Sequence, residues 1–305
     1  MYLHGSVQLN QGGNMDKYSK EIKFHLPGLF RFFKVYETLL TLYEVKREVF
    51  KDNVTIGSIY GSPGYHIWNG GRLMQVSIQR NELENIKSFM EYHRIPARFT
   101  FTNCLIEEKH LYDTLCNDTT SLFHTELNEI ICNSEILEKY LRTNYPKYSF
   151  ISSTTKRLTS VENINKECEN NYTLLVLDYK YNNNYEILKD IKDTSKLEIL
   201  CNAVCFPDCP RRLEHYKLIS QAQLENNATL MPACEATEFT FDKAKRMPHF
   251  VSLESINKYT EYGVTNFKLE GRTNHPLDLI EILLYYLIKE EDKYEVRALL
   301  QKIVW

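Results

Sequence analysis

The sequence lacks a strong excess of charge and lacks long apolar runs. Among its 305 residues, 37 Lys and Arg stand against 40 Asp and Glu, so the net charge of −3 provides no long-range attraction to a polyanion. No stretch reaches the roughly 18 uninterrupted apolar residues of a membrane span, and the polar start MYLHGSVQLNQGGN is unlike a signal peptide. We therefore expect a cytoplasmic protein with no membrane partner and no strong nonspecific binding of nucleic acid.

Several catalytic motifs are also missing. The chain contains neither H-E-x-x-H nor G-x-S-x-G, and no G-x-G-x-x-G follows the first expected strand. The glycine-rich segment YGSPGYHIWNGGR lacks the G-K-[ST] end of a P-loop. These absences count against H-E-x-x-H metalloproteases and against serine hydrolases with a G-x-S-x-G motif. They also count against dinucleotide binding and nucleotide triphosphate binding. We interpret the glycine-rich segment as a rim loop, in which Tyr65, Trp68 or Arg72 could contact a ligand.

From about residue 53 onward, short apolar runs alternate with longer amphipathic stretches, which is typical of βα units and a parallel sheet. Strands are expected in segments 54–61, 97–103, 128–134, 148–154, 172–179, 196–200, 249–253 and 264–271, with helices between them, including one around 185–192. No Pro/Ser-rich linker interrupts these seven or eight units. The sequence therefore predicts an α/β fold, a single (β/α)8 TIM-like barrel. An open doubly wound sheet is the alternative.

The expected domain organisation is simple. Residues 1–14 form a polar tail, and residues 15–305 form the barrel domain. Within that domain, residues 15–52 are expected to be an N-terminal helical cap, because their apolar side chains recur at helical spacing.

Half of the eight cysteines are clustered. The segment CNAVCFPDCPRR is followed by MPACEATEF, and together they contain Cys201, Cys205, Cys209 and Cys234. Pro207 and Pro210 exclude a continuous helix, so the first three thiols are expected on a loop. That loop follows the strand at 196–200, whose carboxyl end belongs to the catalytic face of a barrel. Pro210 suits the first position of the next helix, which would make Cys209 its N-cap.

Reduced cytosolic thiols that cluster in this way bind metals more often than they form disulfides. Four cysteines match the ligands of a 4Fe-4S cluster or of a tetrahedral zinc ion, and spacing alone does not choose between them. The absence of paired C-x-x-C knuckles favours the iron–sulfur cluster over zinc. The other four cysteines are scattered singly and are interpreted as ordinary thiols: Cys104, Cys116, Cys132 and Cys168.

A second cluster of polar residues lies in GVTNFKLEGR. Strand alternation places Phe267 and Leu269 toward the helices, and Lys268 and Glu270 toward the barrel interior. Arg272 follows in the loop. Charged groups in a barrel interior are costly unless paired, so these residues form either an ion network or a substrate anchor.

Other candidates follow expected strands, where barrel enzymes place functional groups. Asp178 is a candidate catalytic residue, and Asn103, Thr154 and Lys156 are candidate substrate ligands. Residues of these types also begin helices as N-caps, so position is the only argument for them. Two arginines after the cysteine loop join Arg272 as candidate anchors for an anionic group, namely Arg211 and Arg212.

NFKLEGR, preceded by a cysteine-bearing strand and loop, resembles the signature region of peptidase family U32, the collagenase-like proteases, over roughly residues 195–285. IGSIYGSPGYHIWNGGR, FISSTTK and CPRRLEHY are similar to an uncharacterised bacterial subgroup of such proteins. The resemblance implies a barrel. It also implies that the four clustered cysteines bind an iron–sulfur cluster, as in members that hydroxylate RNA bases or quinone precursors without oxygen. Lys268, Glu270 and Arg272 would then face the same cavity. The first three cysteines are more tightly spaced here than in the usual family pattern.

Three functional hypotheses follow. The first is an iron–sulfur oxidoreductase, hydroxylase-like, acting on a small-molecule or RNA-borne substrate with an electron donor as partner. Lys268, Glu270 and Asp178 would be its catalytic residues. The second is a non-enzymatic barrel that holds zinc or a cluster, and the third is a U32-type peptidase.

Overall fold

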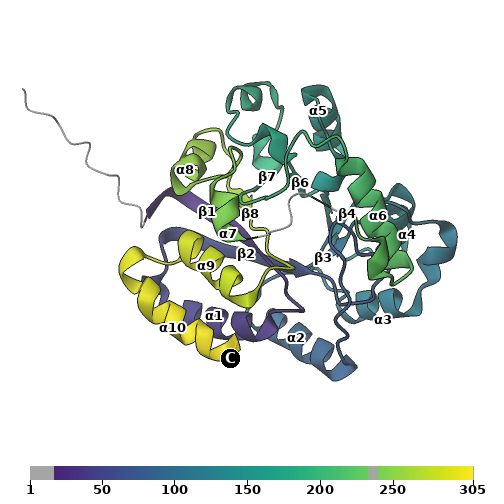
Figure 1. Cartoon of the computed structure of the whole chain (residues 1–305), viewed down its shortest axis with the longest axis horizontal. Helices are drawn as coiled ribbons and strands as arrows, with labels where there is room; N and C mark the ends of the chain where they lie inside the picture. The colour runs from purple at the N-terminus through teal and green to yellow at the C-terminus, as the bar shows by residue number, and fades with distance from the viewer. Residues whose placement is uncertain (1–16, 233, 235–239, 305) are drawn as a thin grey trace, which may run out of the picture.

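The computed structural model describes residues 17–232, 234 and 240–304, so the expected polar tail at 1–14 lies outside the described residues. Eight parallel strands pair in sequence order, and the last pairs with the first to close a barrel (Figure 1). They are β1 Lys17–Pro27, β2 Asp52–Gly61, β3 Ala97–Phe101, β4 Glu129–Cys132, β5 Ser149–Ser152, β6 Leu174–Val176, β7 Leu197–Leu200 and β8 Asn266–Lys268. The predicted TIM-like barrel is confirmed.

Helices surround the barrel (Figure 1). They are α1 Phe33–Val45, α2 Arg80–Tyr92, α3 Thr114–Leu122, α4 Glu135–Asn144, α5 Val161–Glu169, α6 Arg212–Leu224, α7 Phe241–Lys245, α8 Leu253–Glu261, α9 Pro276–Leu287 and α10 Lys293–Val304. Between β6 and β7, the helix expected around 185–192 is replaced by short 3-10 turns, one of them at Glu186–Asp190. No helix in the described part of the chain is long and apolar enough to cross a membrane.

The N-terminal segment corrects one prediction. Residues 15–52 do not form a helical cap throughout, because Lys17–Pro27 is the first barrel strand and only α1 within the segment is a full helix. Ile22, Phe24 and Leu26 alternate along β1 and are completely buried. Polar residues between them, such as His25, break up the apolar run. No strand forms at 249–253, where one was expected. The barrel still has eight strands, because β1 was not among the expected ones.

An apolar layer between the strands and the helices forms the main core. Its aromatic centre is the ring of Phe99, whose centroid lies 5.6 Å from that of Phe30 and 5.2 Å from that of Phe123. These rings are fully or almost fully buried. Tilted and edge-to-face ring pairs add to the free energy gained by burying their area. The core thus holds β3 against the segment between β1 and α1, which contains Phe30, and against the end of α3, where Phe123 is the C-cap.

Replacing Phe99 with alanine tests the importance of this aromatic centre. Phe99→Ala should lower the free energy of unfolding by about 3–5 kcal/mol, because it removes a fully buried ring and leaves a cavity. Urea denaturation would measure the loss. The control is Tyr92→Ala, which removes a ring that is 77% exposed and should change the free energy by no more than about 0.5 kcal/mol. Equal losses in the two variants would contradict the assignment.

Candidate functional site

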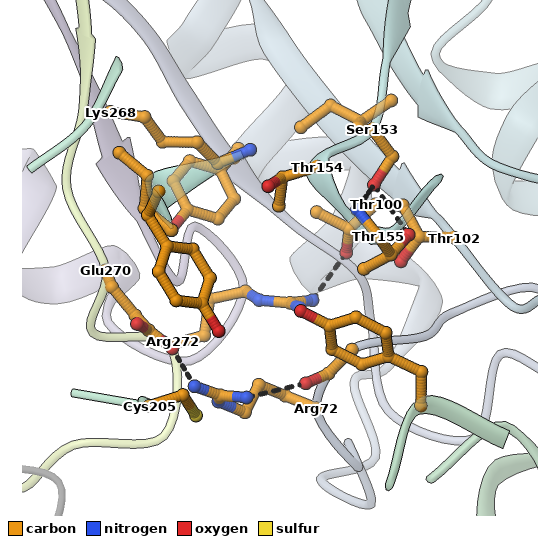
Figure 2. Close-up of a pocket in the computed structure, with 16 residues that line it drawn as sticks. Arg72, Thr100, Thr102, Ser153, Thr154, Thr155, Cys205, Lys268, Glu270 and Arg272 are labelled. Atoms are coloured by element: carbon orange, nitrogen blue, oxygen red, sulfur yellow. Dashed lines mark hydrogen bonds and ion pairs between the residues drawn. The ribbon is translucent and has the colours of Figure 1, made fainter. Parts of the chain in front are cut away.

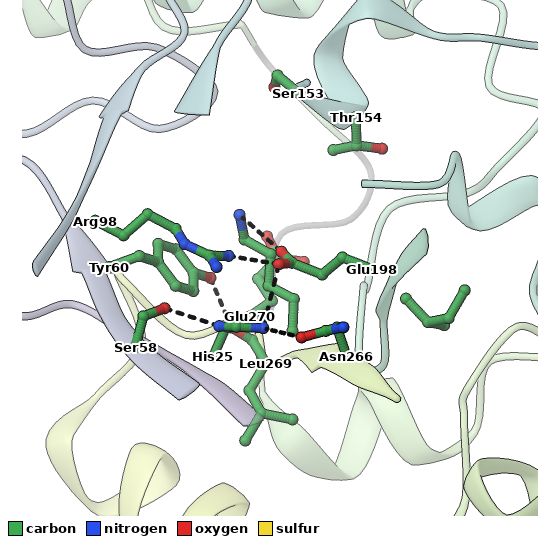
Figure 3. A network of polar contacts seen from close by, with 12 residues as sticks. His25, Ser58, Tyr60, Arg98, Ser153, Thr154, Glu198, Asn266, Leu269 and Glu270 are labelled. Atoms are coloured by element: carbon green, nitrogen blue, oxygen red, sulfur yellow. Dashed lines mark hydrogen bonds and ion pairs between the residues drawn. The ribbon is translucent and has the colours of Figure 1, made fainter. Parts of the chain in front are cut away.

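A carboxylate in the barrel interior contacts nitrogen-bearing side chains from three other strands. Glu198 on β7 is completely buried and forms a short ion pair with Arg98 on β3 (Figure 3). Its Oε2 lies 3.4 Å from Nε2 of His25 on β1, and its Oε1 lies 3.7 Å from Nζ of Lys268 on β8. Arg98 is also paired with Glu129 on β4 at 2.8 Å. The network thus links strands from all around the barrel.

The network fixes the protonation of its members. Burial tends to raise the pKa of Glu198, but Arg98, His25 and Lys268 outweigh it and hold that pKa at about 2. Burial, with the charge of Arg98, lowers the pKa of His25 to about 3, so this imidazole is neutral. Its Nε2 faces the oxygen Oδ1 of Asn266 at 3.2 Å and therefore carries the proton. Its Nδ1 then accepts the hydrogen bond from Oγ of Ser58 at 2.8 Å.

Lys268 lies between this network and the open end of the barrel. Burial lowers the pKa of its amine to about 7, and the charges of Arg98 and Arg272 act in the same direction, while Glu198 acts in the other. Its Nζ lies 4.2 Å from the centre of the Tyr60 ring. At neutral pH a substantial fraction of Lys268 is therefore an uncharged amine, able to accept a proton.

A polar pocket opens above Lys268 at the carboxyl ends of the strands (Figure 2). This cavity, which we call the mouth pocket, has a volume of about 80 Å³. It is lined by Tyr60, Gly71, Arg72, Thr100, Thr102, Ile131, Ser153, Thr154, Thr155, Tyr179, Leu200, Cys205, Tyr216, Lys268, Glu270 and Arg272. Hydroxyl groups lie on one wall and cationic side chains on another (Figure 2). The arrangement suits a small polar ligand.

The loop after β2 closes one side of the mouth pocket. The guanidinium of Arg272 donates to the carbonyl oxygen of Gly70 at 3.0 Å and to Oδ1 of Asn69 at 3.0 Å. A side chain at Gly70 would lie only 2.4 Å from the carbonyl oxygen of Thr102. The glycine therefore permits the close approach of the loop to the end of β3. Arg72, two residues after Gly70, forms an ion pair with Glu270 across the opening of the mouth pocket.

Three of the four clustered cysteines line a second cavity beside the mouth pocket. This cysteine cavity has a volume of about 230 Å³, and Cys205, Cys209 and Cys234 line it together with His215. The Nε2 atom of His215 is buried and has no hydrogen-bond partner among the described residues. The two cavities have four lining residues in common, namely Arg72, Tyr179, Cys205 and Tyr216. They are therefore neighbouring parts of one site.

Cys201, the fourth predicted ligand, does not line the cysteine cavity. It is completely buried in the layer between barrel and helices, and its thiol contacts the carbonyl oxygen of Ile199 at 3.5 Å. Burial raises the pKa of Cys201 well above its usual value, which disfavours the thiolate that a metal requires. No group of three or more His, Cys, Asp or Glu side chains within 17–232, 234 and 240–304 is arranged to hold a metal ion. Cys205, Cys209 and Cys234 therefore line one cavity without being placed as a ready metal site, and Cys201 lies outside that cavity.

Cys209 also differs from its expected place. Helix α6 begins at Arg212 with Arg211 as its N-cap, so Cys209 lies in the preceding turn and is not the N-cap. The N–H of Arg212 donates to the carbonyl oxygen of Cys209 at 3.2 Å. Pro210 is tolerated in this turn, and the helix starts after it rather than at it.

The remaining candidates have different surroundings. Thr154 lines the mouth pocket. Asn103 is buried and joins the loop after β2 to α6, donating to the carbonyl oxygens of Ile67 at 2.8 Å and Ser220 at 3.1 Å. Lys156 pairs with Glu167 at 2.8 Å in a separate surface recess.

Asp178 and Arg212 form a buried ion pair with each other. Nη1 of Arg212 lies 2.9 Å from Oδ1 of Asp178, and Nη2 lies 2.9 Å from Oδ2. The guanidinium also covers the ring of Tyr179 at 3.9 Å and lines the cysteine cavity. Arg211 is exposed and pairs with Glu214 at 3.2 Å. The structure therefore gathers Lys268, Glu270, Arg272 and Thr154 at the mouth pocket, with Arg212 next to it.

The charged network below the pocket was not predicted from the sequence. Glu198 and Arg98 lie inside the short runs KLEIL and ARFTF, where each interrupts an apolar strand. A charged residue within a buried strand is the signal that could have revealed them, because it requires a partner inside the barrel. His25 lay in a segment assigned to a helix.

The closed parallel barrel, with its polar pocket at the carboxyl ends of the strands, places the protein among TIM-like barrels with a site on the catalytic face. No model of a protein family matches the chain. The chain is similar to an uncharacterized protease of Methanocaldococcus jannaschii, with 27% identity over 128 residues that cover 38% of this chain and 36% of that protein. The chain thus spans only about a third of this relative.

The solved structure of a U32 peptidase shares the fold. It superposes with a TM-score of 0.50 at 14% sequence identity, covering 87% of this chain and 97% of the other. These comparisons support the resemblance to family U32 that the sequence indicates. At this level of identity, the structural likeness establishes the fold alone.

Glu198→Gln tests whether the interior network holds the barrel together. The change should lower the free energy of unfolding at pH 7 by about 3–5 kcal/mol, because Arg98 loses a buried ionised partner and Lys268 loses its counter-charge. Urea denaturation measures the difference. The matched control is Glu254→Gln, which breaks an exposed pair with Lys258 and should cost at most about 1 kcal/mol. An unchanged midpoint for Glu198→Gln would exclude the structural role.

The pKa of Lys268 can be measured by trace labelling with acetic anhydride, which acylates only the uncharged amine. Peptide mass spectrometry should show half-maximal labelling of Lys268 at about pH 7, with labelling rising above that pH. Lys258 serves as an internal control, because its pairing with Glu254 raises its pKa and delays its labelling to more alkaline pH. In Glu198→Gln the profile of Lys268 should shift to lower pH. Identical profiles for the two lysines would contradict the inferred environment.

Proposed function

We propose that the protein is an iron–sulfur barrel enzyme that carries out a redox modification of a small molecule bound in the mouth pocket. The observation that supports this most directly is the grouping of Cys205, Cys209 and Cys234 around one cavity that adjoins the pocket. Oxygen-independent hydroxylation is the reaction that the family resemblance implies. With water as the oxygen source, each hydroxylation would release two electrons and two protons, so an external electron acceptor would be its partner.

The three cysteines are the side chains that would hold the cluster, and His215 or a non-protein group could complete its ligand set. Thiolates are the usual ligands of iron–sulfur clusters, and histidine replaces some of them in certain centres. Arg72 and Arg212 also line the cavity. When bound, the cluster would supply electron transfer.

The chain's own residues would bind the substrate and manage its protons. Lys268 lines the mouth pocket as a partly uncharged amine and can accept a proton from a bound ligand. The hydroxyl groups of Ser153 and Thr154 can orient a polar substrate on the opposite wall. A cavity of about 80 Å³ suits a small molecule, or one small group, better than a stacked nucleobase. The net charge of −3 also provides no general attraction to RNA.

Peptide hydrolysis is the second candidate, and it follows the printed descriptions of the two similar proteins as a protease and a peptidase. Ser58, His25 and Glu198 form a chain of contacts like the relay of a serine hydrolase. However, Ser58 is completely buried and lines neither cavity, and a histidine whose pKa is about 3 is a poor base at neutral pH. This relay therefore supports a structural role more strongly than catalysis.

Anaerobic purification followed by absorbance and by iron, sulfide and zinc analysis tests the proposed cluster. The wild-type protein should be coloured and contain iron and sulfide, and Cys205→Ala and Cys209→Ala should lose both. Cys201→Ala should retain the cluster, because that thiol faces the core outside the barrel. Cys168→Ala is the control for loss of a thiol elsewhere, in α5.

A colourless protein without metal would refute the proposal, and stoichiometric zinc would favour the non-enzymatic zinc barrel. If Cys201→Ala lost the iron while remaining folded by circular dichroism, the three-cysteine assignment would be wrong and the four-cysteine assignment restored. Proteolysis of casein by the wild type but not by Ser58→Ala would favour the peptidase.

A further inference from the structure

Arg272 is a buried cation whose hydrogen bonds go only to uncharged acceptors within the described residues. Its Nη1 donates to Oγ1 of Thr100 at 2.6 Å and to Oδ1 of Asn69 at 3.0 Å, and its Nη2 donates to the carbonyl oxygen of Gly70 at 3.0 Å. Only 9% of the residue is exposed. Burial lowers the pKa of Arg272 to about 10, so the group remains charged at neutral pH. A buried charge of this kind is costly unless an anion accompanies it.

The carboxylates below Arg272 are engaged by other cations. Glu129 and Glu198 both pair with Arg98, and Glu198 is also the partner of Lys268. Among these five interior groups, Arg98, Lys268 and Arg272 carry three positive charges when Lys268 is protonated, whereas the two glutamates carry two negative charges. With Lys268 protonated, one positive charge is left uncompensated at the pocket end of the group. With Lys268 uncharged, the remaining charges cancel, so an anion bound at the pocket end would favour the protonated amine.

Both cations at that end face the same space. Lys268 and Arg272 line the mouth pocket, and both lie over the ring of Tyr60, at 4.2 Å and 6.0 Å from its centre (Figure 2). The three described hydrogen bonds of Arg272 use three of its five N–H donors. Its remaining donors and the ammonium group of Lys268 can thus bind one ligand group. Ser153 and Thr154 provide hydroxyl groups on the other side of the pocket.

We propose that the mouth pocket recognises its substrate through a single carboxylate group, bound by Arg272 and Lys268. A planar carboxylate matches the N–H donors of a guanidinium, and its one negative charge equals the surplus in the pocket. A phosphate dianion would bring a second charge that these interior groups do not balance. The inference rests on the proposed function only in taking this pocket as the substrate site. It does not depend on the cluster.

Titration of the full-length protein with acetate labelled with ¹³C at the carboxyl carbon tests this assignment. Broadening of the acetate signal should give a dissociation constant for the wild type, and acetamide, which is neutral and of similar shape, should bind at least about tenfold more weakly. Arg272→Gln should weaken acetate binding by about tenfold or more. Arg80→Gln is the matched control, because it removes an exposed arginine of α2 that pairs with Glu84. It should bind acetate like the wild type.

Arg272 also holds the loop after β2, so circular dichroism must show that Arg272→Gln is folded. If it is not, Lys268→Gln replaces it and should also weaken acetate binding. Equal affinity for acetate and acetamide, or unchanged acetate binding in the pocket variant, overturns the proposal. Tighter binding of inorganic phosphate than of acetate overturns the choice of a carboxylate. Iron is measured in the same samples. If iron-free protein binds acetate selectively, the carboxylate site is supported even though the proposed cluster is refuted.

Discussion

The ion pair between Glu198 and Arg98 lies at the centre of the barrel, and the site above it depends on this contact. Arg98 comes from β3 and Glu198 from β7, on opposite parts of the strand order, and the same carboxylate contacts β1 and β8 through His25 and Lys268. A barrel interior filled with charge is stable only when every member has a partner. The network satisfies this condition for Arg98 and leaves Lys268 with a shared counter-charge. Burial, together with the charges of Arg98 and Arg272, lowers the pKa of this amine and allows it to lose its proton near neutral pH.

Much of the fold could be predicted from the sequence, because seven strands are marked by short apolar runs, six of which precede a helix. The first strand was missed for a physical reason. Outward-facing Ile22, Phe24 and Leu26 pack against the helices, but His25 faces a polar interior, so β1 lacks a continuous apolar run. Sequence spacing also indicated the orientation of Lys268, since alternation along β8 separates it from Phe267, which is completely buried in the outer core.

The cysteine site was less predictable. Proline placement in CNAVCFPDCPRR correctly excluded a continuous helix, but it could not show on which side of β7 each thiol lies. Cys201 directly follows the strand, and its side chain points to the helices, whereas Cys205 lies farther along the loop and reaches the mouth of the barrel. A difference of a few residues at a strand end therefore separates one thiol from the others. No spacing rule contains this information, because it depends on the path of the loop.

Gly70 limits how the mouth pocket could change to accept a ligand of another size. Any side chain at position 70 would collide with the backbone at Thr102. The loop that carries Arg72 can therefore lie this close to the end of β3 only with glycine at that position. A larger residue at position 70 would displace this loop, and the loop would then lose the hydrogen bond that Arg272 donates to its carbonyl oxygen. Variation in ligand size would therefore have to come from the opposite wall, where Ser153 and Thr154 follow β5. The pocket thus has one fixed side and one adaptable side.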